Sequence, residues 1–156
     1  MINIDEKYMK EALKEAKKAY LEGEVPVGCV VVCDNKIIAR SHNTKESKKN
    51  ALFHAELIAI NKASKKIGDW RLDNCDLYVT LEPCQMCAGA LMQARIRKVI
   101  YGCSDNKNGS IDTLMKMYEV KGFNHYPEVV SGVLTEECST ILKNFFKELR
   151  KTPLKD

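Results

Sequence analysis

The sequence contains no uninterrupted apolar run that approaches the ~20 residues needed to cross a membrane as a helix. Its first stretch, MINIDEKYMKEALKEAKK, is charged where a secretory signal peptide would be apolar. The 8 glycines and 4 prolines are too few for a linker-rich chain, and no internal repeat is present. We therefore expect one globular domain over residues 1–156, located in the cytoplasm and without a membrane partner.

A strong excess of charge is also absent. The net charge is +4, which is too small to identify a nucleic-acid-binding protein by itself. Basic residues are concentrated between Lys45 and Lys49 and between Lys143 and Lys155. A solvated basic surface explains these clusters as well as an RNA-binding surface does, so the charge permits an RNA partner without requiring one.

The chain has seven cysteines, an odd number that does not fit a framework of disulfides. Metal ligation and simple burial are the expected uses. Cys29 and Cys33 lie on the same face of a predicted strand and are expected to be small buried apolar residues. Cys84 and Cys87 have the spacing of metal ligands.

Hydrophobic periodicity and turn residues predict ten elements. The predicted helices cover residues 5–22, 52–63, 83–95, 113–120 and 135–151, and the predicted strands cover 27–33, 36–40, 77–81, 98–102 and 128–131. The first two strands should form a hairpin around Asp34-Asn35. The helix over 52–63 is apolar at most positions and should be buried on nearly every side. Strands that alternate with helices after this hairpin predict an α/β fold, a three-layer α/β/α sandwich around one five-stranded mixed sheet.

Three local signals predict how helices begin. Asp5 and Thr135 are expected N-caps, because their side-chain oxygens can accept hydrogen bonds from free N–H groups of the first turn. Pro83 is expected at the first helical position, where no hydrogen bond is lost. The loop over 41–50 is polar and should reach toward the functional site.

Two short motifs in the middle of the chain combine residue types that bind zinc. His54-Ala55-Glu56 supplies one imidazole, and Pro83-Cys84-Gln85-Met86-Cys87 supplies two thiols. Such a set matches a catalytic zinc site, which has three protein ligands and a fourth position open to water. The two cysteines are three residues apart at a helix start, so one helix face can present both to one ion. Glu56 is expected beside the ion as a proton shuttle.

The order H-x-E followed by P-C-x-x-C is the signature of zinc-dependent nucleobase deaminases. Two other interpretations stay open. A closed structural zinc site would need a fourth ligand, for which His42, Cys75 and Cys103 are the candidates. A redox pair would use Cys84 and Cys87 but has no need of the H-A-E motif. The open site favours an enzyme over both.

Longer stretches of the chain resemble one family almost end to end. They are EVPVG at 24–28, RLDNCDLYVTLEPCQMCAGA at 71–90, FNHYPEVVSGVLTEEC at 123–138 and FF at 145–146. The chain thus resembles the bacterial tRNA-specific adenosine deaminases of the cytidine deaminase-like superfamily. The resemblance implies hydrolytic deamination of adenosine to inosine at the wobble position of a tRNA anticodon, typically in an arginine tRNA. It also implies one zinc ion per subunit, an anticodon stem-loop as partner, and a homodimer.

The resemblance further assigns roles to loop residues. Asn43 matches the asparagine that hydrogen-bonds the target base, and Asp105 matches the acidic residue that lies against the anticodon backbone. An ordinary role in a loop or turn is the alternative for each. A basic stripe of Lys143, Lys147 and Arg150 on the last helix would suit phosphates, and of Phe145 and Phe146 one should be in the core while the other could stack on RNA. His125 is expected to form local hydrogen bonds.

Two departures from the family leave the choice of tRNA open. Ala51-Leu52-Phe53 stands where many members have Pro-Thr-Ala, and Asp112 stands where relatives commonly have a glycine or small residue. The alternative functions are a free-base deaminase acting on guanine or cytosine, and a catalytically silent RNA-binding subunit.

Overall fold

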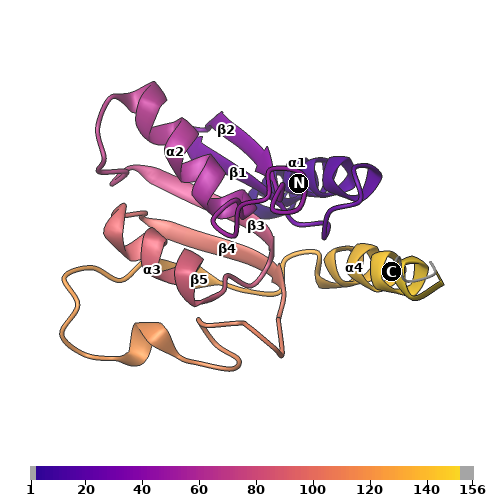
Figure 1. The fold of residues 1–156 in the computed structure, drawn as a ribbon. Helices are drawn as coiled ribbons and strands as arrows, with labels where there is room; N and C mark the ends of the chain where they lie inside the picture. The colour runs from indigo at the N-terminus through magenta and orange to yellow at the C-terminus, as the bar shows by residue number, and fades with distance from the viewer. Residues whose placement is uncertain (1–2, 152–156) are drawn as a thin grey trace.

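The computed structural model describes residues 3–151 and contains one five-stranded sheet (Figure 1). The elements in chain order are α1 (Ile4–Leu21), β1 (Gly28–Cys33), β2 (Lys36–His42), α2 (Ala55–Ile67), β3 (Cys75–Leu81), α3 (Gln85–Gln93), β4 (Lys98–Cys103), the 3-10 helix η1 (Met117–Glu119), β5 (Glu128–Val130) and α4 (Thr135–Lys151). The strand order is β2-β1-β3-β4-β5. Strand β1 is antiparallel to β2 and β3, while β3, β4 and β5 are parallel. The sheet is therefore mixed.

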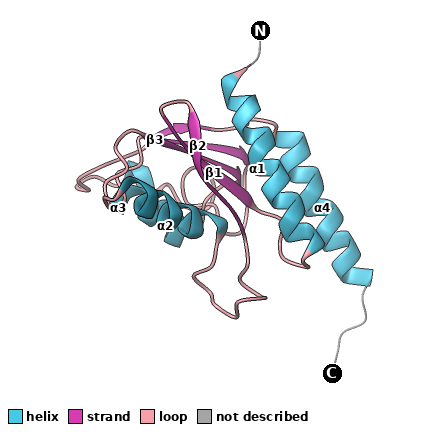
Figure 2. Ribbon diagram, turned by 90° about the horizontal axis from the view of Figure 1, so that it is seen from above, coloured by secondary structure: helices cyan, strands magenta, loops and turns pink. Residues whose placement is uncertain are grey.

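Helices cover both faces of the sheet. Helices α1 and α4 lie together on one face, and α2 and α3 lie on the other (Figure 2). Successive strand residues alternate between two apolar clusters, so Val31 packs in the cluster with α2 and α3 while Val30 packs in the cluster with α1 and α4. The predicted three-layer α/β/α sandwich with its five-stranded mixed sheet is confirmed. No helix within residues 3–151 is long and apolar enough to cross a membrane.

The β1–β2 hairpin follows the prediction. Asp34 and Asn35 both have positive φ, 50° and 62°, as the two central residues of a type I′ turn require. Cys29 is fully buried, whereas Cys33, at the end of β1, is only half-buried. The expectation of burial is thus confirmed for Cys29 alone, since the strand end next to the turn leaves Cys33 partly open to solvent.

Helix α2 begins three residues later than predicted and is less buried. The preceding loop is closed by hydrogen bonds of its own, including one from the Thr44 N–H to the Phe53 carbonyl at 3.1 Å. One face of α2 is fully buried through small residues such as Ala59 and Ala63, while Leu57 and Ile58 are half-buried. The prediction of burial on nearly every side was wrong, because only one face meets the sheet.

The helix predicted over 113–120 is also wrong. Only the three-residue η1 forms there. The N–H groups of Ile111, Asp112 and Thr113 donate to the carboxylate of Glu82, at 3.2, 2.8 and 3.2 Å. The Leu114 N–H donates to the Gly109 carbonyl and the Met117 N–H donates to the Ser110 carbonyl, at 2.9 and 3.0 Å, so the segment does not follow the i to i−4 pattern of an α-helix.

All three predictions of helix starts need correction. The N-cap of α1 is Asn3, whose side chain accepts from the Glu6 N–H, rather than Asp5. Thr135 is the first residue of α4, and its hydroxyl donates to the Gly102 carbonyl. Pro83 precedes the N-cap of α3, so it lies outside the helix. Asp5 and Thr135 instead form hydrogen bonds with distant residues: Asp5 accepts from the Tyr78 hydroxyl and Thr135 donates to Gly102.

Trp70, the single tryptophan of the chain, lies at the surface. Its side chain is 53% exposed, and the Arg71 guanidinium lies 4.4 Å from its ring centroid. This loop follows α2, at the end of the helix away from His54.

Candidate metal centre and active site

His54, Cys84 and Cys87 come together at one point. The imidazole Nδ1 lies 3.6 Å from the Sγ atom of Cys84 and 3.6 Å from that of Cys87. A nitrogen ~2.1 Å and a sulfur ~2.3 Å from one tetrahedral ion are about 3.6 Å apart. Within residues 3–151 this is the one group of three or more histidine, cysteine or acidic residues that could hold a metal ion. The spacing of the donor atoms fits zinc.

Two helix starts create this arrangement. His54 is the N-cap of α2 and Cys84 is the N-cap of α3, so both have extended backbones. Cys87 lies in the first turn of α3. The free N–H groups and positive dipole ends of two helices therefore surround the three donor atoms. This environment favours thiolates over thiols.

The two sulfurs differ in their proton affinity. The hydrogen bond from the Cys87 thiol lowers the pKa of Cys84 to about 4, and the His54 imidazole acts in the same direction. The hydrogen bond to Cys84 and burial raise the pKa of Cys87 well above its ordinary value. One thiolate is thus available readily, and a bound cation would favour the second by its charge.

Glu56 lies beside the three donors. Its side chain is only 4% exposed, and its carboxyl group hydrogen-bonds the Cys87 thiol. Burial raises the pKa of Glu56 to about 7, and the negative charge of Cys84 adds to this rise. It does not belong to the set of three metal donors. A carboxyl group with this pKa can both accept and donate a proton near neutral pH.

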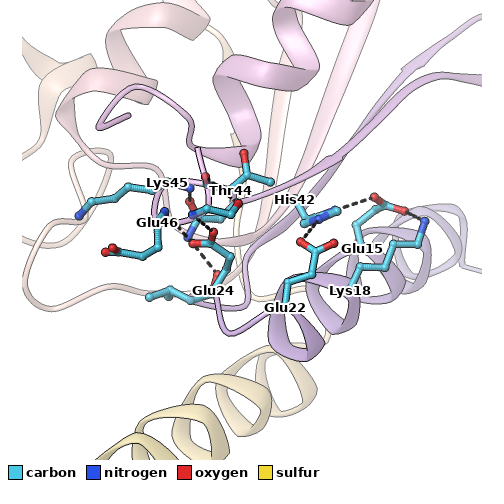
Figure 3. Close-up of polar contacts among 11 residues, drawn as sticks. Glu15, Lys18, Glu22, Glu24, His42, Thr44, Lys45 and Glu46 are labelled. Atoms are coloured by element: carbon cyan, nitrogen blue, oxygen red, sulfur yellow. Dashed lines mark hydrogen bonds and ion pairs between the residues drawn. The ribbon is translucent and has the colours of Figure 1, made fainter. Parts of the chain in front are cut away.

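The three candidates for a fourth protein ligand all lie elsewhere. His42 ends β2, and its ring nitrogens face the carboxylates of Glu15 and Glu22 at 3.3 and 2.8 Å (Figure 3). Cys75 is buried at the start of β3, and burial raises its pKa to about 12. Cys103 donates to the Thr80 carbonyl instead. Within the described chain the group of three donors stays open on its fourth side, which does not favour a closed zinc site.

Asn43 directly follows β2 and is held tightly. It is 8% exposed, its Nδ2 donates to the Val25 carbonyl at 3.2 Å, and its Oδ1 accepts from the Lys45 N–H at 3.2 Å. Each of these atoms can form one more hydrogen bond. The side chain is therefore oriented by backbone groups and retains capacity for a ligand, while its role toward a base stays a prediction.

Asp105 organises the loop after β4. Its Oδ1 accepts from the N–H groups of Lys107 and Asn108, at 3.0 and 3.2 Å, and its own N–H donates to Glu82 at 3.1 Å. The turn role that the sequence left open is thus present in the structure. Asp112, the departure from the family in this loop, accepts a hydrogen bond of 2.5 Å from the Tyr101 hydroxyl. This bond ties Asp112 to β4.

The last helix presents the predicted basic stripe to solvent. Lys143, Lys147 and Arg150 are all exposed. Phe145 is 9% exposed and packs against Tyr20 with ring centroids 5.8 Å apart, whereas Phe146 is 39% exposed. Of the two phenylalanines, Phe146 is the one that a ligand could reach.

His125 forms a hydrogen bond to a distant part of the chain instead of the local one expected for it. Its Nε2 and the Ile96 carbonyl are 2.6 Å apart. Since Ile96 lies shortly before β4, this contact ties the segment before β5 to the segment before β4.

A surface pocket of 710 Å³ is separate from the donor group. Residues of α1, β2, the following loop and α2 line it, among them Arg40, Leu52, Phe53 and Leu57. None of the three donors lines it. Leu52 and Phe53, which belong to the other departure from the family, therefore contribute apolar surface next to His54 in the chain.

Sequence reasoning missed three polar residues that hold the site together. The Ser41 hydroxyl donates to the Ala55 carbonyl at 2.5 Å and so fixes the first turn of α2. Glu24 and Glu82 are buried carboxylates that bind loop backbones. For Glu82, one signal in the sequence could have indicated this role: an acidic residue that directly follows an apolar strand and precedes Pro83.

Comparison with known proteins agrees with this geometry. Residues 3–150 match the model of the MafB19-like deaminase family. The tRNA-specific adenosine deaminase of Bacillus subtilis is 54% identical over 147 residues, which are 94% of this chain and 91% of that protein. The tRNA-specific adenosine deaminase of Rickettsia bellii is 45% identical over 91% of this chain and 99% of its own length.

Solved structures agree as well. A structure from work on A-to-I editing by tRNA:A34 deaminases at the wobble position of transfer RNA has a TM-score of 0.85 and 41% identity, over 87% of this chain and 99% of the other. A guanine deaminase from Nitrosomonas europaea has a TM-score of 0.75 at 19% identity, over 90% and 83% of the two chains, and shows the shared fold alone. From its fold, its whole-chain identity and its deaminase motifs, the chain belongs to the tRNA-specific adenosine deaminases of the cytidine deaminase-like superfamily.

Proposed function

We propose that this protein hydrolyses adenosine to inosine at the wobble position of a tRNA anticodon, with an arginine tRNA as the first substrate to test. The meeting of His54, Cys84 and Cys87 beside the buried Glu56 carries the chemical part of this proposal. The names and coverage of the relatives support the RNA part. A single catalytic domain over 1–156, acting in the cytoplasm where tRNA is modified, is the arrangement that we propose.

The reaction adds water to the ring carbon that bears the amine and releases ammonia. Zinc held by one imidazole and two thiolates would supply the Lewis acidity that makes water nucleophilic near neutral pH. Glu56 takes a proton from the attacking water and gives it to the adjacent ring nitrogen. It then takes the remaining proton of the added hydroxyl and delivers it to the amine, so that the C–N bond breaks, the ring carbon becomes a carbonyl and ammonia leaves. Its low exposure keeps bulk water from competing for these protons.

Binding of the anticodon would use groups on two loops and one helix. Asn43 would hydrogen-bond the flipped base through the capacity left on its amide, and Asp105 would lie against the anticodon backbone. The exposed stripe on α4 would contact phosphates. The half-buried apolar residues Leu57 and Ile58 of α2 are suited to contact a second subunit in the proposed homodimer.

An assay with unmodified anticodon stem-loops tests this function. Purified protein that contains one zinc ion per subunit should convert the wobble adenosine to inosine. Inosine is measured by mass spectrometry after the RNA is digested to nucleosides. Free guanine and free cytosine in parallel reactions should release no ammonia. Release of ammonia from a free base without any inosine in the stem-loop would identify a free-base deaminase instead.

A further inference from the structure

The buried carboxylate of Glu82 organises the loop that carries Asp105. Glu82 is 2% exposed and lies between β3 and the metal-binding segment. Its Oε1 accepts from the Asp105 N–H at 3.1 Å and from the Thr113 hydroxyl at 2.5 Å. Its Oε2 accepts from the N–H groups of Ile111, Asp112 and Thr113. Five donors from one loop therefore converge on a single side chain.

Glu24 does the same for the loop that begins with Asn43. Glu24 is 1% exposed, and one of its oxygens accepts from the Glu46 N–H at 2.9 Å (Figure 3). The other oxygen accepts from the Ser47 N–H at 2.7 Å. Burial by itself would raise the pKa of Glu24, but these backbone hydrogen bonds hold it below its ordinary value. The carboxylate is thus stabilised in its charged form by the loop that it binds.

Neither carboxylate forms an ion pair within residues 3–151. A buried charge without a cation is costly unless backbone dipoles compensate it, so each loop must keep its N–H groups aimed inward. The two loops carry the two residues proposed to bind substrate. A loop held in this way presents its side chain in one orientation before substrate arrives, which reduces the entropy lost on binding.

We propose that Glu82 and Glu24 are positioning residues that fix Asp105 and Asn43 for binding of the substrate RNA. This inference rests on the proposed function. Glu82 acts on the anticodon side through Asp105, and Glu24 acts on the base side through Asn43. Neither residue takes part in proton transfer.

The two oxygens of Glu82 allow a specific test by Glu82→Gln. A glutamine has one acceptor oxygen and one donor NH2. The oxygen should take the place that faces three N–H groups, which leaves the NH2 against the Asp105 N–H. The substitution therefore releases Asp105 while it keeps most of the bonds to Ile111, Asp112 and Thr113. Glu6→Gln, at an exposed position of α1, is the matched control.

The experiment measures kcat and KM for the anticodon stem-loop, the zinc content, and hydrogen exchange of the loop amides. Glu82→Gln should raise KM about tenfold and change kcat by less than about twofold, as expected for the loss of one hydrogen bond to a charged group. Zinc content should stay at one per subunit, and the amide of Asp105 should exchange faster. Glu6→Gln should change none of these.

A milder pair of variants keeps the test valid if Glu82→Gln does not fold. Thr113→Val removes the hydroxyl donor to Glu82 and should raise KM by a smaller factor, while Thr113→Ser retains the hydroxyl and should restore the wild-type KM. A role of the Thr113 hydroxyl confined to stability would lower the melting temperature of Thr113→Val without raising its KM.

Other results would overturn the inference. Loss of zinc or a fall in kcat at constant KM would show that Glu82 acts on the metal-binding segment beside it. Unchanged KM together with unchanged exchange of the Asp105 amide would show that Glu82 holds nothing needed for binding. If the wild-type protein makes no inosine, the proposed function fails, whereas hydrogen exchange still decides whether the carboxylate holds the loop.

Discussion

Replacement of Glu56 by glutamine should abolish turnover without loss of the fold or of the metal. The side chain is 4% exposed and its carboxyl group contacts the Cys87 thiol. Glutamine has almost the same volume and can keep one hydrogen bond there, so no cavity is left. It cannot accept and return a proton. General acid–base catalysis contributes about 10²–10⁴-fold to rate, so the rate should fall by at least about 10²-fold, or about 3 kcal/mol of barrier.

The assay for Glu56→Gln is single-turnover conversion of an anticodon stem-loop at saturating enzyme, with inosine measured by mass spectrometry. Saturation removes effects on binding, so the rate reports the chemical step. Zinc content and the dissociation constant for the stem-loop should match those of the wild type. Glu119→Gln, at an exposed position of η1, is a matched control and should keep full rate.

Two results would refute this reasoning about Glu56. A variant that keeps more than a tenth of the wild-type rate would show that another group moves the proton. A variant that loses zinc would show that Glu56 belongs to the metal site rather than to the space beside it. The second result would also remove the basis for the proton shuttle in the mechanism.

Four further predictions follow from other parts of the structure. Cys87→Ser should remove zinc, measured by inductively coupled plasma mass spectrometry, and inosine formation should stop with it, because a hydroxyl is a poor substitute for a thiolate ligand. Gly102→Ala should lower the free energy of unfolding by about 1–3 kcal/mol in urea titrations, since a Cβ there collides with the Cys138 side chain and the Thr80 carbonyl. Phe145→Ala should lower that free energy by about 3 kcal/mol, whereas Phe146→Ala should leave it almost unchanged and weaken stem-loop binding instead. Glu24→Gln should lower the melting temperature at neutral pH. Because the pKa of Glu24 is depressed in the folded protein, the difference in melting temperature between wild type and variant should persist above about pH 4.5 and shrink as the pH falls below it. A difference in melting temperature that stays constant as the pH falls would contradict the role of the carboxylate.

The three candidate metal donors could be predicted from sequence because the information is local. Two cysteines three apart at a helix start can reach one ion, and the only partner still needed was His54 at the start of another helix. The layers of the fold were also predictable, since strands and helices alternate with clear periods. The meeting of the two helix starts is a tertiary fact, and the structure brings their donor atoms to 3.6 Å.

The parts that failed depend on distant contacts. Residues 113–120 have a helical pattern, but the Thr113 N–H donates to Glu82, and the Met117 N–H donates to the Ser110 carbonyl instead of to the Thr113 carbonyl that an α-helix would use. The start of α2 was misplaced because the loop before it is closed by its own hydrogen bonds and by Glu24. No periodicity of apolar residues reports a buried carboxylate that binds backbone.

In the proposed function, chemistry and recognition therefore depend on different parts of the structure. The metal donors and Glu56 lie at the ends of helices packed on the sheet, where the backbone is fixed by the core. Asn43 and Asp105 lie on loops whose shape depends on two carboxylates. Leu52 and Phe53 line the surface pocket, whereas the oxygens of Glu24 bind the N–H groups of Glu46 and Ser47. In the proposed function, a substitution on one of these loops would therefore change RNA binding more than the chemical step.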